Sequence, residues 1–341
     1  MKEETVIIDG SMGEGGGQIL RTSLSLSMIT RRPCKIERIR AGRKKPGLQM
    51  QHLVALKAAQ KISSATVQGA EIGSSEVYFS PGGVKGGNYE LSIGSAGSVT
   101  LVLQTILPAL VTAEESSHIS LEGGTHNPWA PTADFLERVF LPILNRMGPT
   151  VTTTLERYGF YPAGGGCLKV DIKPVNKLTR IDLVERGEIR EGKATAILAC
   201  IPDTIGHREV NYIKENFNLP DNHFNVQQVA SAGPGNVLSI EIVCDGITEM
   251  ITAFGKRGVT SEAVARNAIF EANNYVHSGA PVGPHLADQI LIPMALAKGG
   301  SFRTGPMTPH VLTNIDVIKH FLDVKIDLHP IDGKIWHVEI C

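Results

Sequence analysis

The sequence predicts an α/β fold in which one large domain of repeated modules carries a smaller inserted α/β domain. Strand-like and helix-like runs alternate along most of the chain. A unit made of an apolar run, a glycine-rich loop and a helical pattern recurs. Between about residues 184 and 278 the sequence pattern changes, beginning with a run of charged residues, and module-like sequence resumes afterwards. We therefore expect residues 1–183 and 279–341 to form the large domain and residues 184–278 the insertion.

Length and composition limit the possible functions. The 341 residues suffice for about two domains with full cores. The 33 basic and 34 acidic residues nearly cancel, so a nucleic-acid site would have to be local. Five cysteines are scattered without zinc-site spacing, which favours a reducing compartment. Because no apolar run approaches the ~20 residues of a membrane span, and no signal peptide is recognisable, we expect a soluble cytoplasmic protein without a membrane partner.

The first module begins with an apolar run at residues 5–8 and continues through a glycine-rich loop into a helical pattern at residues 18–29. Strand, glycine loop and helix start form a suitable cradle for phosphate, because backbone N–H groups and the helix dipole attract anions. Glu14 lies inside this loop, and a carboxylate repels phosphate unless a divalent cation lies between them. A plain glycine-rich turn is the alternative.

Two familiar nucleotide loops are excluded here. A Walker A loop has Lys and then Ser or Thr after its last glycine, whereas Gly15 is followed by two more glycines. The dinucleotide fingerprint requires a third glycine at the position that Gln18 occupies. The loop therefore belongs to some other kind of site, or to none.

Further elements follow in order. We expect strands at residues 34–39, 77–79, 89–93, 118–122, 151–155 and 167–172, and helices at residues 49–62, 98–113 and 131–147. Residues 98–113 give the clearest helix, with a wide apolar stripe. In the third helix Pro131 suits the first turn, Gly148 suits the stop, and Pro142 predicts a kink.

The opening module has a second copy at residues 93–104 and a looser third copy at residues 279–298. Repeated loops of one kind are expected to converge on one site. Each predicted helix carries polar residues near its start, namely Gln18 and Arg21, Gln104, and Asp288 and Gln289. In the insertion, a charged run at residues 185–193 precedes strand-like residues 194–200, an amphipathic stretch at 208–217 and strands near 226, 237–244 and 250–254.

A basic cluster lies in the turn-prone connection at residues 38–45. Arginine forks and glycine backbone together bind phosphate well, and Arg40 and Arg43 are the candidates. A solvated basic loop is the alternative. A second glycine cluster, residues 158–166, precedes a strand, and close backbone packing explains it better than a ligand does.

His310 is the candidate nucleophile. Thr308 and Pro309 mark a helix start, which places the histidine in the first turn. A helix N-terminus lowers imidazole basicity and keeps a nitrogen lone pair free for attack or for metal binding. Asp288 could orient the second ring nitrogen. A single histidine with a structural hydrogen bond is the alternative.

Together these motifs resemble the RNA 3′-terminal phosphate cyclase family. The resemblance covers nearly the whole chain, at residues 9–21, 39–52, 94–104, 123–131, 160–166, 254–258, 286–298 and 308–318. It implies a large domain of three repeated modules, each a sheet packed on two helices, with a small inserted α/β domain. It also implies that a histidine attacks the α-phosphate of ATP, that AMP passes to an RNA 3′-phosphate, and that the 2′-hydroxyl then closes a 2′,3′-cyclic phosphate.

The resemblance assigns a role to each candidate. His310 is the nucleophile, with Asp288 as its orienting group. Glu14 would hold the divalent metal, magnesium or manganese, on the ATP phosphates. The phosphates of ATP or of the RNA end would be bound by Arg21, Arg40, Arg43 and Gln51. The remaining nucleotide contacts would come from Gln104, Pro131, Phe254, His285, Asp288 and Gln289.

The chain departs from the family pattern at two positions: Tyr158 replaces the usual Arg or His before a signature glycine, and His285 replaces a tyrosine-like stacking residue of some relatives. Two other classes stay open. A non-catalytic cyclase-like protein of ribosome assembly would lack the nucleophile, and an enolpyruvyl transferase would act on a small phosphorylated molecule without adenylation. His310 and Glu14 argue against the first class. The segment around Pro309 and His310 and the single insertion argue against the second. The sequence leaves the oligomeric state open.

Overall fold

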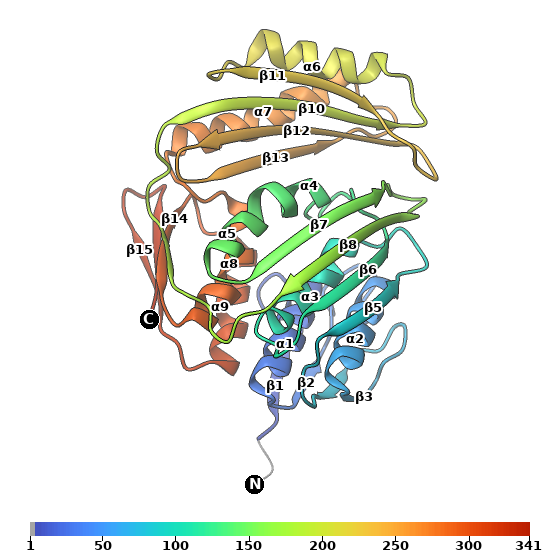
Figure 1. The fold of residues 1–341 in the computed structure, drawn as a ribbon, viewed down its shortest axis with the longest axis vertical. Helices are drawn as coiled ribbons and strands as arrows, with labels where there is room; N and C mark the ends of the chain where they lie inside the picture. Colours follow the sequence, from blue (N-terminus) through green and yellow to red (C-terminus); the bar gives the residue numbers. More distant parts are fainter. Residues whose placement is uncertain (1–3) are drawn as a thin grey trace.

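A computed structural model describes residues 4–341 and contains four four-stranded mixed sheets (Figure 1). Three of them repeat one topology. In each, the first strand pairs parallel with the second, and the fourth strand lies antiparallel between the second and the third, giving the orders β1-β2-β4-β3, β5-β6-β8-β7 and β9-β14-β16-β15. One helix connects the first two strands of a module and a second helix follows the second strand. The expected fold class of three repeated modules with an insertion is confirmed.

The bounds of the elements follow the modules. The first module consists of β1 (Val6–Asp9), α1 (Gly17–Thr30), β2 (Cys34–Glu37), α2 (Met50–Ser63), β3 (Thr66–Gln68) and β4 (Val77–Ser80). The second consists of β5 (Gly87–Ser92), α3 (Val99–Leu110), β6 (Ser117–Gly123), α4 (Ala133–Phe135), a π-helical turn (Leu136–Phe140), α5 (Leu141–Arg146), β7 (Thr150–Arg157) and β8 (Gly166–Lys173). The third consists of β9 (Ile181–Leu183), α8 (Pro284–Ala297), β14 (Gly300–Thr304), α9 (Pro309–Phe321), β15 (Ile326–Pro330) and β16 (Trp336–Ile340).

The insertion separates β9 from α8, the first strand and the first helix of the third module. It contains β10 (Ile189–Ala199), α6 (Thr204–Asn216), β11 (Asn222–Gln228), β12 (Gly235–Cys244), β13 (Thr248–Phe254) and α7 (Ser261–Ser278). Its sheet has the order β11-β10-β12-β13, and α6 and α7 pack against each other and against its strands. The domain limits at residues 184 and 278 remain a prediction.

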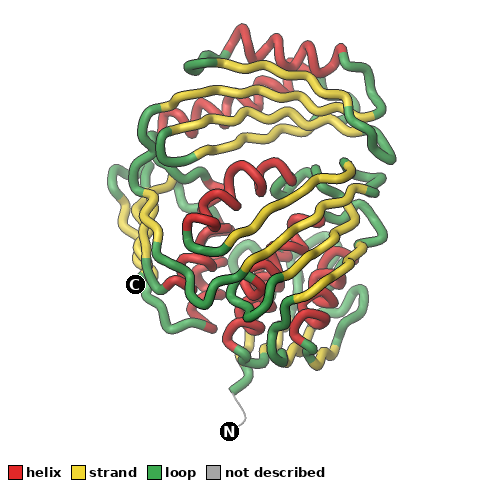
Figure 2. The backbone as a smooth tube through the Cα atoms, viewed as in Figure 1, coloured by secondary structure: helices red, strands yellow, loops and turns green. Residues whose placement is uncertain are grey.

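Helices of different modules pack together in the core. Helix α1 contacts α2, α3 and α9, and α8 contacts α9. In Figure 1 and Figure 2, α1 and α3 lie behind the sheet of β5 to β8, and α8 and α9 lie to the left of that sheet. Leu20, Leu24 and Met28 lie one helical turn apart on α1 and are almost fully buried, as their spacing predicts. Helix α1 thereby brings residues from both ends of the chain to one place. No helix of the described chain is long and apolar enough to span a bilayer.

One helix was missed and the start of another needs correction. Helix α7 was not predicted, although Val264, Ala268 and Ala272 recur at helical spacing behind the N-cap Thr260. The helix expected from Pro131 begins at Ala133 instead, because the side chain of Thr132 caps it by accepting a hydrogen bond from Phe135 N. A kink was predicted at Pro142; a π-helical turn lies directly before this residue, at Leu136–Phe140.

Candidate functional site

The glycine-rich loop before α1 places Glu14 against two distant segments. Gly13 and Gly15 adopt positive φ angles of 51° and 61°, which side chains rarely tolerate. The backbone N–H of Glu14 donates to Thr313 Oγ1 at 2.9 Å. Its carboxylate pairs with Arg43, whose Nη2 also donates to the Glu14 carbonyl at 2.9 Å. The loop, the basic connection and α9 therefore meet around one carboxylate.

His310 stands in the first turn of α9, as predicted. Thr308 caps the helix by accepting a hydrogen bond from Val311 N at 3.2 Å, and Pro309 occupies the first turn. The exposed His310 carries a ring whose Nδ1 lies 2.7 Å from Oε1 of the Gln18 side chain on α1. Two residues 292 positions apart in the sequence thus form the central contact of the site.

Asp288 does not contact His310 directly, which corrects the expected arrangement. Gln18 lies between them: its Nε2 donates to Asp288 Oδ2 at 3.0 Å while its Oε1 faces His310. The reason is geometric, since Asp288 projects from α8 and His310 from α9, and the α1 side chain fills the gap. Burial raises the pKa of Asp288 to about 7, and the nearby Arg21 opposes this shift.

The electrostatics favour a neutral imidazole at His310. Partial desolvation of the ring lowers its pKa, and the positive charges of Arg21 and Arg43 lower it further. His52 on α2 is also neutral, because burial followed by the charges of Arg21 and Arg40 lowers its pKa to about 3. A neutral imidazole retains a lone pair, which nucleophilic attack requires.

Other predicted phosphate ligands have definite positions. Nη1 of Arg40 donates to the carbonyls of Lys45 and Gly47 at 2.6 and 2.9 Å, so this guanidinium braces its own loop. Oε1 of Gln51 accepts a hydrogen bond from Ser98 N at 2.9 Å, which ties α2 to the second glycine loop. Arg21 is held near His52 at the start of α1.

The predicted nucleotide contacts are more dispersed. The pKa of His285, in the first turn of α8, is lowered mainly by burial, and a proton on the nearby His310 would lower it further. Gln289 donates to the His285 carbonyl at 2.9 Å, and its buried Oε1 has no partner in the described chain. Three further residues stand elsewhere, with Gln104 on α3, the Pro131 carbonyl bonded to Thr100, and Phe254 packed with Phe160 and Val237. The contacts of residues 4–341 do not join these three to His310, and their role stays a prediction.

The metal prediction concerns Glu14 alone. In the described residues no group of three or more His, Cys, Asp or Glu side chains is arranged to hold a metal. Magnesium in nucleotide sites commonly takes only one or two carboxylates together with phosphate oxygens. Glu14 is partly exposed, so the residues present fit a metal held jointly with a substrate and do not form an all-protein cage.

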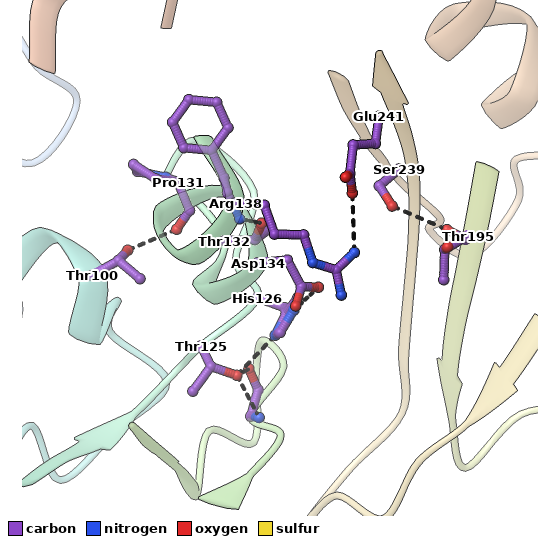
Figure 3. Close-up of polar contacts among 12 residues, drawn as sticks. Thr100, Thr125, His126, Pro131, Thr132, Asp134, Arg138, Thr195, Ser239 and Glu241 are labelled. Carbon is purple, nitrogen blue, oxygen red and sulfur yellow. Dashed lines mark hydrogen bonds and ion pairs between the residues drawn. The ribbon is translucent and has the colours of Figure 1, made fainter. Parts of the chain in front are cut away.

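A second histidine, His126, belongs to a buried structural network (Figure 3). Its Nε2 lies 3.1 Å from Asp134 Oδ2 and its Nδ1 lies 2.9 Å from the Thr125 hydroxyl. Nearby, Arg138 reaches across to Glu241 on β12 at 3.1 Å and so links the π-helical turn to the inserted sheet. His126 is 1% exposed, which leaves no room for a substrate.

The residues 158–166 pack closely, as expected. A Cβ atom on Gly164 would lie 2.9 Å from Ala96 Cα, and one on Gly166 would lie 2.6 Å from Gly159 N. These glycines therefore permit backbone contact with the second glycine loop and within their own turn.

Sequence reasoning missed three residues of the site: Gln18 as the partner of His310, Thr313 as the anchor of the loop, and His52 between two arginines. The i+3 spacing of Thr313 from His310 places both side chains on one helix face, which was a usable signal. Only the tertiary structure reveals the role of Gln18.

Comparisons with known proteins agree across the chain. A family model described as "RNA 3'-terminal phosphate cyclase" matches residues 12–328. A protein of that name from Koribacter versatilis is 50% identical over 324 residues, covering 95% of this chain and 91% of the relative. Another protein of that name, from Ectopseudomonas mendocina, is 45% identical over 341 residues, covering 100% of this chain and 99% of the relative. A solved enolpyruvyl transferase, NikO from Streptomyces tendae, is 12% identical with a TM-score of 0.37 and covers 98% of this chain and 48% of that chain, a likeness too weak to assign fold or activity.

Proposed function

This chain belongs to the RNA 3′-terminal phosphate cyclase family, a family of enzymes, and from that premise we propose that it converts an RNA 3′-phosphate into a 2′,3′-cyclic phosphate with ATP. The observation that carries the mechanism is the contact between Gln18 and His310, at 2.7 Å in the first turn of α9. It supports a histidine whose second nitrogen is free to act on a substrate.

The chemistry has three steps. His310 Nε2 attacks the α-phosphorus of ATP, forming a phosphorus–nitrogen bond and releasing pyrophosphate. An oxygen of the RNA 3′-phosphate then attacks the same phosphorus and displaces the histidine, which leaves an RNA adenylate. Finally the neighbouring 2′-hydroxyl attacks the RNA phosphorus, loses its proton and expels AMP. The covalent intermediate divides one difficult displacement into easier steps.

The charged residues suit these steps. Arg21 and Arg43 place positive charge beside His310, where the α-phosphate would be attacked. The same charges keep the imidazole unprotonated, so they serve both the nucleophile and the phosphate. Glu14 would hold a divalent cation, which would neutralise charge on the ATP phosphates.

The nucleotide pocket would extend from His310 along the first turn of α8. His285 could contact the adenosine, and the buried, unpartnered Oε1 of Gln289 is an acceptor that a ligand or water could satisfy. Gln104, Pro131 and Phe254 would complete the nucleotide contacts. The RNA end would be gripped by the exposed basic loop at Arg43, Lys44 and Lys45. With a net charge near zero, few phosphate contacts and a modest salt dependence are expected.

A direct test uses an RNA oligonucleotide that carries a radiolabelled 3′-phosphate. With ATP and magnesium, the label should become resistant to phosphatase and should be released by mild acid followed by phosphatase. Omission of ATP should leave the label sensitive. A label that stays sensitive under all conditions would favour a non-catalytic role for the chain.

A further inference from the structure

Helices α1, α8 and α9, which come from opposite ends of the chain, meet along a short row of polar side chains that we call the polar line. Gln18 and Thr22 lie one turn apart on α1, as His310 and Asn314 do on α9, with Asp288 from α8 between them. The Thr22 hydroxyl donates to Asn314 Oδ1 at 2.7 Å, and Asn314 Nδ2 donates to the Asp288 carbonyl at 2.7 Å. These bonds fix the relative positions of the helices. Gln18 is thereby held between the imidazole and the carboxylate, and is only 6% exposed.

We propose that Gln18 is a positioning residue which, oriented by the Asp288 carboxylate, holds the imidazole of His310 in the tautomer with its proton on Nδ1. Nε2 then keeps the lone pair with which it attacks. The inference rests on the proposed function, because it identifies what prepares that nucleophile. In this arrangement Asp288 orients Gln18 and does not contact His310 itself.

Hydrogen-bond polarity fixes both the orientation of the Gln18 amide and the tautomer of His310. A carboxylate accepts but cannot donate, so the amide nitrogen of Gln18 must face Asp288. The amide oxygen then faces His310 and can only accept, so Nδ1 must carry the proton. A neutral imidazole has a single N–H, which leaves Nε2 unprotonated. While Asp288 on α8 is ionised, its charge thus determines which ring nitrogen of His310 on α9 carries the proton.

The arrangement can also be reversed. A protonated Asp288 could donate to the amide oxygen of Gln18, and the amide would turn its nitrogen toward His310. Nδ1 would then have to accept, and the proton would move to Nε2, where it blocks attack. Because burial raises the pKa of Asp288 to about 7, this reversal falls near neutral pH. The titratable and charged groups around the line are Glu14, Arg21, Arg43, His52 and His285.

The tautomer can be measured without substrate by ¹⁵N NMR of the full chain labelled at histidine, with His310 assigned from His310→Ala. At pH 8.5 the wild type should show the Nδ1–H tautomer, and Gln18→Leu should show a mixture. Adenylation by Gln18→Leu should slow about a hundredfold with little change in KM for ATP. Gln60→Leu, on α2 and bonded to its own turn, is the matched control and should behave as the wild type.

Two further variants sharpen the test. Asp288→Asn lets the amide of Gln18 take either orientation, so a tautomer mixture is expected. In the isosteric Gln18→Glu the new carboxyl group must share one proton with Asp288. Its other oxygen still faces Nδ1, so this variant should keep the Nδ1–H tautomer and more of the adenylation rate than Gln18→Leu. A pure Nδ1–H tautomer in Gln18→Leu, or an Nε2–H tautomer in the wild type, would overturn the inference. Failure of the proposed function would appear differently, as a wild type that never becomes adenylated whatever its tautomer.

Discussion

The carboxylate of Glu249 accepts a hydrogen bond from the backbone nitrogen of Gly283 at 2.8 Å, and so joins β13 of the insertion to the N-cap residue of α8. A second backbone N–H, that of Met250, donates to the same carboxylate at 3.0 Å. Glu249 is 4% exposed. The insertion therefore holds the end of the helix that carries His285 and Asp288.

Loss of this anchor should affect both stability and activity. In Glu249→Leu the N–H of Gly283 loses its partner, which should cost about 1–3 kcal/mol of unfolding free energy. The start of α8 should also loosen, with slower adenylation. Urea unfolding and single-turnover adenylation measure the two effects. Glu249→Gln keeps an acceptor oxygen and should retain more of both; equal losses in the two variants would contradict the role given to this bond.

Gly17 should be intolerant of a side chain for a local reason. A Cβ atom there would lie 2.4 Å from His52 Nε2 and 2.9 Å from Arg21 Nη1. Gly17→Ala should therefore displace Arg21. Because one charged hydrogen bond to phosphate is then lost, adenylation should slow by at least about tenfold. Gly42→Ala, in an open part of the basic loop, is the control and should retain full activity. In the double variant Gly17→Ala/His52→Ala the imidazole that the new methyl group would meet is gone. This variant should therefore recover part of the adenylation rate.

Glu14 should govern the metal response. Glu14→Ala is expected to slow adenylation and to weaken its dependence on magnesium or manganese concentration, because the proposed carboxylate ligand is missing. Titrations of the adenylation rate with each metal test this. Glu37→Ala, which removes a carboxylate paired with Lys35 on β2, provides the comparison. An unchanged metal titration in Glu14→Ala would remove Glu14 from the metal site.

Glu209 should make the insertion less stable at high pH. Burial raises its pKa to about 7 from 4.5, so the folded chain keeps a proton that the unfolded chain releases. The associated stability is complete below about pH 4.5 and is lost as the pH rises through about 7. Asn236 Nδ2 donates to Oε1 at 2.6 Å, while Glu209 Oε2 and Asn236 Oδ1 are buried without partners in the described chain.

Glu209→Gln supplies a permanent N–H in place of that proton. It should gain stability over the wild type at pH 8.5, on the order of 1–2 kcal/mol, and little at pH 4.5. Urea unfolding at several pH values measures the difference. Glu215→Gln, at an exposed position of the same helix, should not alter the pH slope. If the slopes of wild type and Glu209→Gln coincide, Glu209 does not hold the proton.

The sequence predicted the parts of the fold that local pattern determines. The glycine loops before α1, α3 and α8 and the cap of α9 were recognisable because turn chemistry and helix spacing are local. The resemblance implied a third sheet, but its individual strands were not predicted from the sequence pattern, and its first pair joins β9 to β14 across the whole insertion. Helix α7 was missed because many polar residues obscure its buried stripe of Val264, Ala268 and Ala272.

The site was predictable in its residue types and less so in its connections. His310, Glu14 and the arginines were identified from motif and resemblance. The link from Gln18 to His310 was not, because 292 residues separate them and only helix packing brings them together. Asp288 was expected to orient His310 directly, and the sequence could not reveal that Gln18 lies between the two side chains.

The most direct test of the account is the covalent state of His310. The full chain is incubated with α-labelled ATP and magnesium in the absence of RNA, then digested and mapped by mass spectrometry. We predict an acid-labile adenylate on His310 that is absent from His310→Ala and is chased to RNA bearing a 3′-phosphate. A label that persists in His310→Ala, or that maps to another residue, would contradict the account.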